Sequence, residues 1–264
     1  MNTIDSVVGA VQASAKYRTV APELIRAIAG AELSNRRSVK AAVKATKNKL
    51  HQVVGAYQGS DRAYDRWLAQ LARAREQGAD LRPVCRQLMG NHASTRERLS
   101  TLDQFYDVLF SDLPPVTSVL DLACGLNPLA LPWMPLAPGA RYYACDVDAA
   151  QIHFLAGWLQ LAGFAGGAFT CNLLDGAPGQ AVDVALLLKT IPCLEQLDKA
   201  IGPRLLPAIN AAALIVSFPG HSLGGRSKGM VDSYGSHFAS LVAGQPWQVD
   251  RFEFPGELVF RIRK

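Results

Sequence analysis

From residue 116 onward, short strand-like runs alternate with stretches long enough for a helix, and this alternation most limits how the chain can fold. The runs are rich in aliphatic residues and lie at 117–123, 141–147, 168–173, 182–188 and 213–218. Strands that alternate with helices form a parallel, doubly wound α/β sheet. Two last runs, at 248–254 and 257–263, are separated by a Pro-Gly turn and predict an antiparallel hairpin at the end of that sheet.

The part of the chain before the sheet follows a different pattern. Apolar residues recur at helical spacing at 4–11, 22–29, 39–57 and 94–110, which predicts helices. Pro114 and Pro115 then interrupt the pattern just before the first strand-like run. We therefore predict an all-α N-terminal extension over 1–112 and an α/β domain over 113–264.

Basic residues are concentrated in the helical part. Residues 1–110 hold 17 Lys and Arg against 10 Asp and Glu, a net charge of +7, whereas residues 111–264 hold 10 against 12, a net charge of −2. A basic part joined to a near-neutral part suggests that the first meets a polyanion and the second carries out chemistry. A solvated basic surface without a partner is the alternative, and charge alone does not separate the two.

The sequence has no feature of a membrane or secreted protein. It lacks an apolar run of about eighteen residues, and its amino terminus lacks the basic and apolar regions of a signal peptide. The five cysteines are scattered without a C-x-x-C pair, so neither a disulfide framework nor a zinc site is suggested. We therefore expect a cytoplasmic protein that binds no metal.

The turn after the first strand-like run, L-D-L-A-C-G-L-N-P at 120–128, indicates a ligand. It has one glycine, whereas dinucleotide and nucleoside triphosphate sites use several to surround phosphate. Asp121, Gly125 and Asp146 should lie at the carboxyl ends of neighbouring strands, where such sheets bind ligands and an acid can reach a ribose. S-adenosylmethionine (SAM) has a ribose and no phosphate, and class I SAM-dependent methyltransferases have this sheet with its terminal hairpin. The alternative is that the two acids only cap a turn and a helix.

The segment N-H-A-S-T-R-E-R-L at 91–99 predicts one end of that site. Ser94 and Glu97 have the spacing of a capping box, which would begin a helix. Thr95 would then lie in the first helical turn, whose free N–H groups favour a carboxylate. Arg98 would pair with the same carboxylate, and the methionine end of SAM supplies one.

Several longer strings resemble those of one family, the aminoglycoside-resistance 16S rRNA (guanine-N7) methyltransferases of the Arm/Rmt group. They are K-Y-R at 16–18, K-L-H-x-x-x-G-A-Y at 49–57, H-A-S-T-R-E-R-L at 92–99, L-D-L-A-C-G-L-N-P-L-A-L at 120–131 and S-F-P-G-H-S-L-G-G-R-S-K-G-M at 217–230. The resemblance implies a helical extension that docks on the 30S subunit and a domain that uses SAM to methylate N7 of guanine 1405 in 16S rRNA. It also implies resistance to aminoglycosides such as kanamycin and gentamicin. We expect the protein to act as a monomer.

The resemblance also assigns cofactor contacts to positions of this chain. It assigns the methionine end of SAM to His92, Ser94, Thr95 and Arg98, the first turn to Ala123 and Gly125, and the ribose to Asp146. Asn172 stands where the family usually has an acid that meets the adenine amino group, with Leu173 beside it. An asparagine carbonyl accepts the same hydrogen bond, and Asp175 is a rival for this role.

The chemistry that the resemblance implies requires no catalytic base. N7 of guanine has a free lone pair, so no proton has to leave before it attacks the methyl group. Lys189 follows the fourth strand-like run, where these folds handle the substrate, and it is a candidate for positioning the target base or a phosphate. A plain surface lysine is the alternative.

Two groups of cations are candidates for phosphate contacts. The first comprises Lys40, Lys44, Lys47 and His51, which share one side of a predicted helix, with Arg36 and Arg37 just upstream. Val39, Val43, Leu50 and Tyr57 should then face inward. The second comprises Arg226 and Lys228, in a glycine-rich loop after the fifth strand-like run.

Two other functions remain open from the sequence. A SAM-dependent methyltransferase of another RNA base or of a small molecule would need the cofactor turn but not the basic extension. A non-catalytic RNA-binding protein on the same scaffold would keep the basic face and lose SAM.

Overall fold

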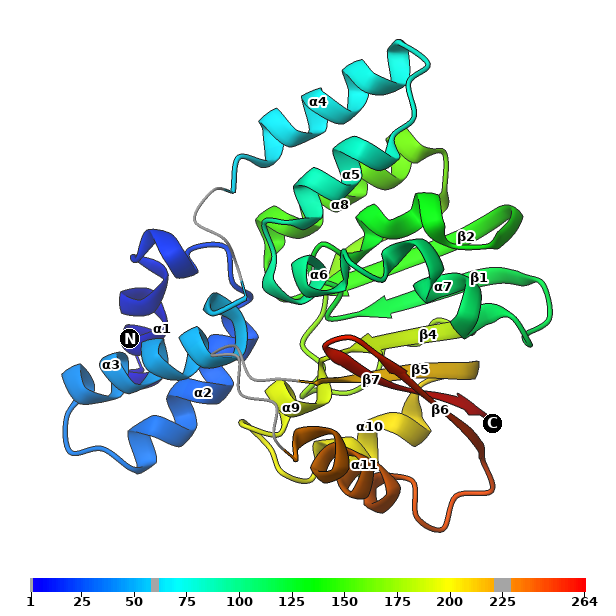
Figure 1. Cartoon of the computed structure of the whole chain (residues 1–264). Coiled ribbons are helices and arrows are strands. Elements are labelled where there is room, and N and C mark those ends of the chain that lie inside the picture. The colour runs from blue at the N-terminus through cyan, green and yellow to red at the C-terminus, as the bar shows by residue number, and fades with distance from the viewer. Residues whose placement is uncertain (1, 58–61, 221–228) are drawn as a thin grey trace.

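The computed structural model describes residues 2–57, 62–220 and 229–264, and its centre is a seven-stranded sheet in the order β3-β2-β1-β4-β5-β7-β6 (Figure 1). The strands are β1 (Val116–Leu122), β2 (Leu136–Asp146), β3 (Ala165–Thr170), β4 (Val182–Leu188), β5 (Ala211–Pro219), β6 (Gln248–Phe254) and β7 (Glu257–Arg263). Strands β1 to β5 run parallel, and β7 pairs antiparallel with both β5 and β6. The predicted α/β fold with its terminal hairpin is therefore confirmed.

The helices lie on both faces of this sheet and in a separate N-terminal group. They are α1 (Thr3–Gln12), α2 (Pro22–Ser34), α3 (Val39–Leu50), α4 (Tyr64–Glu76), α5 (Arg82–Met89), α6 (Ala93–Arg98), α7 (Leu102–Phe110), α8 (Ala149–Ala162), α9 (Ile191–Leu194), α10 (Ile201–Ala208) and α11 (Met230–Leu241). Shorter elements are the 3₁₀ helices η1 (Ala15–Tyr17) and η3 (Asn127–Trp133) and the π-helical turn η2 (His51–Gly55). Within the described ranges, no helix combines the length and the apolar character needed to cross a membrane.

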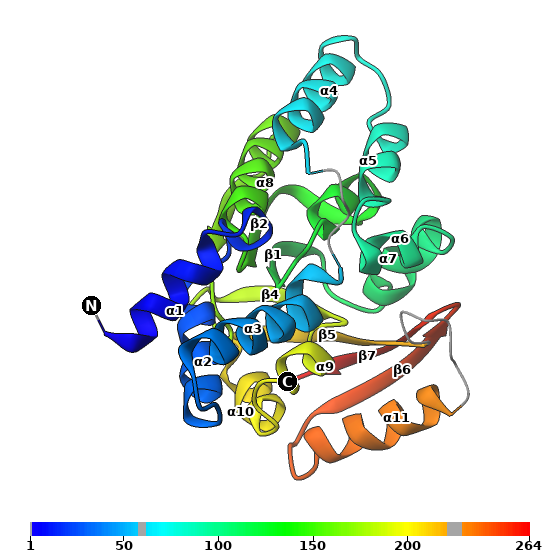
Figure 2. The ribbon, with the colours of Figure 1, turned by 90° about the vertical axis from the view of Figure 1, so that its left-hand side faces the viewer.

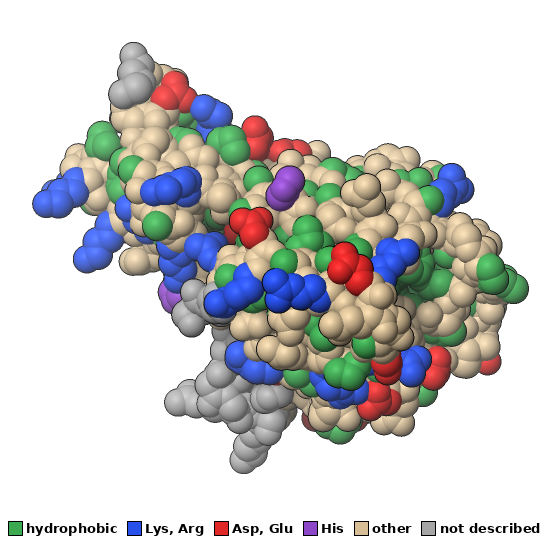
Figure 3. All heavy atoms as spheres, turned by 90° about the horizontal axis from the view of Figure 1, so that it is seen from above, with side chains coloured by type: hydrophobic (Ala, Val, Ile, Leu, Met, Phe, Trp, Pro, Cys, Tyr) green, Lys and Arg blue, Asp and Glu red, His purple; other side chains and the backbone are tan. Residues whose placement is uncertain are grey.

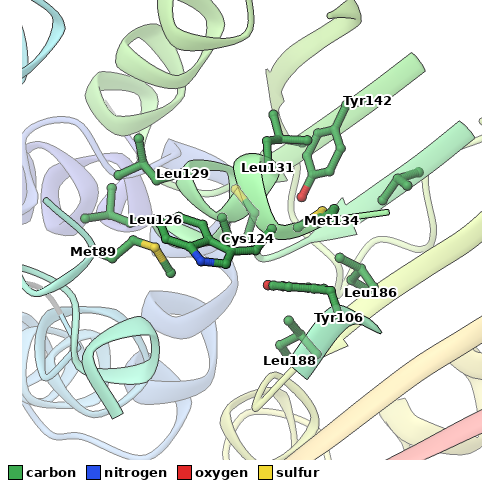
Figure 4. Close-up of a cluster of buried hydrophobic side chains, with 14 of the residues drawn as sticks. Met89, Tyr106, Cys124, Leu126, Leu129, Leu131, Met134, Tyr142, Leu186 and Leu188 are labelled. Atoms are coloured by element: carbon green, nitrogen blue, oxygen red, sulfur yellow. The ribbon is translucent and has the colours of Figure 1, made fainter. Parts of the chain in front are cut away.

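Both faces of the sheet are buried along its central strands β1, β4, β5 and β7, which explains why these strands are nearly continuous apolar runs. Val119 of β1 faces a core shared with α4, α5, α7, α8 and η3, whereas its neighbour Leu120 faces a core shared with α10 and α11. In the first core, Met89 of α5 and Tyr106 of α7 pack beside the residues of η3 that follow the β1 turn (Figure 4). The turn that follows β1 therefore rests on a packed core.

Helices α1, α2 and α3 form a third core of their own, which includes Val7, Ile25 and Leu50. Figure 2 shows this group beside the carboxyl ends of the central strands. Helices α4 to α7 belong instead to the core of the sheet, through residues such as Trp67 and Phe105. The boundary predicted at residue 112 therefore does not separate two cores. Among the described residues, those up to Val54 pack in the third core, and those from Ala63 onward pack in the core of the sheet. The sequence could not reveal this, because the apolar stripe of a helix does not tell which partner covers it.

The N-terminal group carries nearly the same net charge as the longer extension predicted from sequence, on about half as many residues. Residues 1–57 hold 9 Lys and Arg against 3 Asp and Glu, a net charge of +6. We call residues 2–57 the N-terminal subdomain. Most of the excess positive charge of the chain therefore lies in a small part that is distinct from the sheet.

Three local predictions differ from the structure. The helix expected over 94–110 is two helices, α6 and α7, separated by a turn in which the Thr101 hydroxyl donates to the Arg98 carbonyl. The third strand begins at Ala165 and ends at Thr170, earlier than predicted. Val39 was expected to face inward but is 43% exposed, because it lies at the very start of α3.

Candidate functional site

A pocket of about 790 Å³, open to solvent, lies at the carboxyl edge of the sheet. Its lining includes Ala123 after β1, Asp146 at the end of β2, Asn172 after β3 and Lys189 after β4. Strands β1 and β4 are the neighbours at which the strand order reverses, and open α/β sheets bind ligands at this point.

Two turns at the pocket have backbone conformations that side chains rarely adopt. Ala123 has φ 50° and Lys189 has φ 60°, both in the left-handed region. Such residues cost about 1 to 3 kcal/mol each and are found mainly where a site requires them. Gly125 also has a positive φ, 52°, and a Cβ atom there would lie 2.7 Å from Cε1 of His92. The glycine is therefore needed for both its conformation and the close approach of the imidazole.

Asp146 is held rigidly by backbone N–H groups. Its Oδ2 accepts a hydrogen bond from Gly125 N at 2.9 Å, and its Oδ1 accepts one from Val147 N at 2.7 Å. Burial raises the pKa of Asp146, although these N–H groups act to lower it. Each carboxylate oxygen can accept more than one hydrogen bond. Asp148 N also donates to Oδ1, at 3.4 Å, so the acceptor site left for a ligand hydroxyl is on Oδ2.

Asn172 and Leu173 also line the pocket, as predicted for the adenine end. The Asn172 amide donates to Oδ2 of Asp175 at 3.0 Å, and its Oδ1 accepts from Leu174 N at 3.3 Å. Asp175 itself is exposed. The structure thus places Asn172 at the pocket and makes the rival residue, Asp175, the partner that orients it.

His92 and Ser94 lie at the other end of the pocket. The His92 Nδ1 and Ser94 Oγ atoms are hydrogen-bonded at 3.0 Å, and the imidazole stacks on Tyr57 with ring centroids 6.3 Å apart. Burial, together with the charges of Arg98, Arg96 and Lys189, lowers the pKa of His92 to about 4. The imidazole is therefore neutral near pH 7 and can both donate and accept a hydrogen bond.

Thr95 and Arg98 do not lie where the sequence predicted. Thr95 is fully buried, and its hydroxyl donates to the Met89 carbonyl at 2.6 Å. Arg98 is 1% exposed and forms a bidentate ion pair with Glu257, with Nε–Oε2 and Nη2–Oε1 distances of 3.1 and 2.6 Å. The carboxylate that pairs with Arg98 is therefore the side chain of Glu257 and not a ligand. Neither Thr95 nor Arg98 lines the pocket, and both pack beneath the residues that do.

The predicted capping box is also wrong. The N-cap of α6 is His92, which makes no side-chain capping hydrogen bond. Glu97 instead accepts a hydrogen bond from Nζ of Lys189 at 2.6 Å. A salt bridge to a distant strand end has replaced the local interaction that the spacing suggested.

Lys189 is a buried residue, so the alternative of a plain surface lysine is wrong. It is 6% exposed and lines the pocket, and its Nζ lies 2.6 Å from Glu97 and 3.5 Å from Glu257. Burial alone would raise the pKa of Glu257, but the charges of Arg98 and Lys189 lower it below its usual value. Two carboxylates thus hold a charged amine at one end of the pocket.

Asp121 lies beneath the pocket and not in it. It is 1% exposed, and its Oδ2 accepts hydrogen bonds from Asn127 and from the Tyr142 hydroxyl. Asn127 in turn accepts from Arg98 and from the Tyr106 hydroxyl. Burial raises the pKa of Asp121 to about 7, against the effect of these hydrogen bonds. The acid of the first strand therefore anchors the turn, and we assign ligand contact to Asp146 alone.

One wall of the pocket comes from residues that the sequence did not place at the site. They are Leu24 of α2, Val53 and Val54 of η2, and Tyr57. Tyr57 was expected to face inward, and it is the last residue of the family-like string at 49–57. The helical spacing of apolar residues predicts that such a side chain is buried, but it does not show which cavity the side chain faces. Three further lining residues belong to no motif that the sequence analysis identified, and they are Gln151, Thr190 and Cys193.

The cations expected to contact phosphate lie largely on the surface of the N-terminal subdomain, where Lys and Arg side chains gather (Figure 3). Lys40, Lys44 and His51 are exposed, and Lys47 is half-buried. Arg36 and Arg37 are exposed in the loop between α2 and α3, and Arg36 pairs with Glu32 at 3.1 Å. Arg226 and Lys228 lie outside the described residues.

Comparisons with known proteins agree over nearly the whole chain. Residues 13–261 match the family described as "Ribosomal RNA methyltransferase (FmrO)". A protein from Micromonospora echinospora named 16S rRNA (guanine(1405)-N(7))-methyltransferase is 40% identical, over 99% of this chain and 97% of its own length. A protein of the same name from Serratia marcescens is 33% identical, over 99% of this chain and 98% of its own length.

Two solved structures share the whole fold. The 16S rRNA methyltransferase RmtF in complex with S-adenosyl-L-homocysteine is 31% identical, with a TM-score of 0.86, and covers 100% of this chain and 99% of its own. The 16S rRNA methylase RmtB is 29% identical, with a TM-score of 0.81 and the same coverage. Both matches include the N-terminal subdomain as well as the sheet.

Proposed function

The chain belongs to the ribosomal RNA methyltransferase (FmrO) family, and we propose that it transfers a methyl group from SAM to N7 of guanine 1405 in 16S rRNA. The resemblance seen in the sequence is to the same family. One observation carries the proposal: a pocket suited to a nucleoside without phosphate lies directly beside a subdomain with a net charge of +6. A methyltransferase of small molecules would not need that subdomain.

We assign the SAM contacts to seven of the nine predicted residues. They are His92 and Ser94 at the methionine end, Ala123 and Gly125 at the first turn, Asp146 at the ribose, and Asn172 and Leu173 at the adenine. All of them line the pocket except Gly125, whose N–H donates to Asp146. Thr95 and Arg98 support these residues without touching the cofactor. Lys189 is the one Lys or Arg among the described lining residues, and it is already paired with carboxylates, so the pocket is not built for phosphate.

The residues of the pocket need to hold the reactants and not to remove a proton. When bound, SAM supplies a methyl group that N7 of guanine accepts through its lone pair. The chain therefore needs no general base, and we assign none. Lys189 is fixed by Glu97 and Glu257 beside the pocket. Of the two roles predicted for it, we propose that it positions the target base, because its pairing with two carboxylates leaves it poorly suited to a phosphate. Holding reacting groups in line lowers a barrier by up to about 7 to 11 kcal/mol.

The N-terminal subdomain is proposed to dock on the 30S subunit. Lys40, Lys44 and Lys47 share one side of α3, and Arg36 and Arg37 precede it, so phosphates of folded rRNA can meet several cations at once. On this proposal the protein acts as a monomer in the cytoplasm, and methylation at the decoding site confers resistance to aminoglycosides such as kanamycin and gentamicin.

Replacing Asp146 with alanine is expected to weaken SAM binding by about 5- to 150-fold. Without the carboxylate, a ribose hydroxyl is left buried and unpaired, which costs about 1 to 3 kcal/mol. Calorimetric titration of the full chain with SAM measures the effect. Asp107→Ala, at an exposed position of α7, is the matched control and should bind like the parent. An unchanged affinity for the Asp146 variant would remove that residue from the site.

Transfer of a labelled methyl group tests the proposed activity. Purified 30S subunits, 50S subunits and free 16S rRNA are incubated with the full chain and methyl-labelled SAM. We expect label in 16S rRNA, with 30S subunits as the best substrate. Tight SAM binding without transfer to any RNA would favour the non-catalytic RNA-binding alternative, and transfer to 50S rRNA alone would favour another target base.

A further inference from the structure

Ser217, near the end of β5, is a buried serine next to the turn that carries Lys189. Its side chain is fully buried and does not line the pocket, and it is the first residue of the family-like string at 217–230. In the sheet it pairs with Leu188, the last residue of β4, and with Val259 of β7. Because Lys189 directly follows Leu188, the serine lies beside the backbone of the buried lysine.

Ser217 holds that backbone by two hydrogen bonds. The Lys189 N–H donates to both the carbonyl and the hydroxyl oxygen of Ser217, with N···O distances of 3.0 Å. Lys189 has φ 60°, and a residue with a side chain keeps such a left-handed conformation only where its surroundings hold it. The bonds to Ser217 therefore help to fix the turn from which the lysine side chain starts.

The same hydroxyl also holds a carboxylate that faces the lysine side chain. The Ser217 hydroxyl donates to Oε1 of Glu257, and Oε2 of Glu257 lies 3.5 Å from Nζ of Lys189. A serine hydroxyl has one proton, so its donor is used on Glu257 and its acceptor on the Lys189 N–H. One buried hydroxyl thus joins the backbone of Lys189 to a carboxylate that faces its amine.

The amine of Lys189 retains a donor for the pocket. An ammonium group has three donors, and carboxylate oxygens of Glu97 and Glu257 lie 2.6 and 3.5 Å from Nζ. Because Lys189 lines the pocket, the third donor can meet an acceptor there. Guanine presents such an acceptor, O6, next to N7. Where this donor points depends on how firmly the backbone and both carboxylates are held.

We propose that Ser217 is a positioning residue for methyl transfer, which acts through the backbone of Lys189 and through Glu257 to fix the amine where the target guanine is held. The inference rests on the proposed function, because it takes Lys189 as the residue that positions the base. It predicts that loss of the hydroxyl slows methyl transfer but leaves SAM affinity unchanged, since Ser217 does not line the pocket. A hydroxyl that only stabilised the sheet would affect folding and not the rate of the folded protein.

Single-turnover transfer of a labelled methyl group to 30S subunits, with SAM and the full chain at saturating concentrations, tests Ser217. Ser217→Ala is expected to slow transfer by about 10- to 100-fold, since a small displacement of a positioning group costs up to about 100-fold in rate. Its SAM affinity, measured by calorimetry without RNA, should match that of the parent. Ser217→Cys keeps a weaker donor and acceptor, so its rate should lie between those of the parent and Ser217→Ala.

Ser118→Ala is the matched control. Ser118 is also a buried serine in a strand, 4% exposed, and its hydroxyl accepts a hydrogen bond from Asp183 N at 2.9 Å. It lies near the start of β1, away from the carboxyl edge of the sheet. Both serine-to-alanine changes should lower the melting temperature, but only Ser217→Ala should slow transfer. Equal slowing in the two variants would overturn the proposal, because general stability would then set the rate.

A double-mutant comparison shows whether Ser217 acts through Lys189. In a Lys189→Met background, Ser217→Ala should slow transfer little further, because changes in one network are not additive. Full slowing in that background would overturn the proposal, as would a parent-like rate for Ser217→Ala alone or a loss of its SAM affinity as large as the loss of rate. If Ser217→Ala fails to fold by circular dichroism, Ser217→Cys replaces it and should also slow transfer. A parent chain that transferred no methyl group, or a Lys189→Met chain as active as the parent, would instead refute the proposed function or the proposed role of Lys189.

Discussion

Arg98→Ala is expected to lower the free energy of unfolding by about 3 to 5 kcal/mol, the range for breaking a buried ion pair by removing one partner. Arg98 and Glu257 are both buried, and Arg98 also donates to Asn127 at 2.9 Å. Without the guanidinium, Glu257 loses the larger of the two charges that lower its pKa and remains in a site that disfavours its ionised form. The same change frees Asn127, which supports the β1 turn through Asp121.

Denaturant unfolding of the full chain measures this loss. Arg36→Ala is the matched control, because Arg36 forms an exposed i,i+4 pair with Glu32, and such pairs contribute about 0.3 to 0.5 kcal/mol. SAM affinity, measured at a temperature where the variant is folded, should fall less than stability does. A stable Arg98→Ala protein unable to bind SAM would show instead that Arg98 contacts the methionine carboxylate, as its position in the sequence suggests.

Reversing Lys40, Lys44 and Lys47 together to glutamate is expected to cause the largest loss of 30S affinity. Removing one phosphate contact lowers the slope of log affinity against log salt by roughly 0.7 to 0.9, so removing three lowers it by about 2 to 3. SAM affinity should not change, because these lysines lie on the solvent side of α3 and not among the residues that line the pocket. Filter binding of 30S subunits over a salt series measures both the affinity and the slope.

A matched control for that triple variant lies in the α/β part of the chain. Lys199, Arg204 and Arg251 have exposed side chains, and their reversal to glutamate makes the same change in net charge. If docking uses α3, the control should retain most of the 30S affinity and most of the salt slope. Equal losses in the two variants would mean that net charge alone attracts the subunit, and parent-like binding by the α3 variant would place the docking surface elsewhere.

The strands and the position of the pocket could be predicted because they depend on local pattern. Strands buried on both faces are continuous apolar runs, and the topology that follows from their alternation with helices fixes which strand ends meet. Asp146 and Gly125 stand at those ends, and the structure joins them by a hydrogen bond of 2.9 Å. The single glycine in the first turn was informative for the same reason, since its role is local.

The partners of the buried charges could not be predicted from local pattern. Arg98 pairs with Glu257, 159 residues further along the chain, and Glu97 pairs with Lys189. The sequence predicted a ligand carboxylate as the partner of Arg98 and a capping box for Glu97. In the structure, ion pairs with residues distant in the sequence take the place of both predicted interactions. The pocket wall formed by Val54 and Tyr57 escaped prediction for a related reason: periodicity shows that a side chain is buried but not what it is buried against.

Chemical mapping of the methylated base shows whether this chain methylates N7 of guanine 1405. Purified 30S subunits are incubated with the full chain and SAM, the 16S rRNA is cleaved with borohydride and aniline at N7-methylguanine, and reverse transcription locates the break. We predict one new stop adjacent to guanine 1405, present with the parent chain and SAM, absent without SAM, and strongly reduced with Asp146→Ala. A new stop at a different guanine, or unbroken 16S rRNA from subunits incubated with a SAM-binding parent chain, would show that guanine 1405 is not the target of this protein.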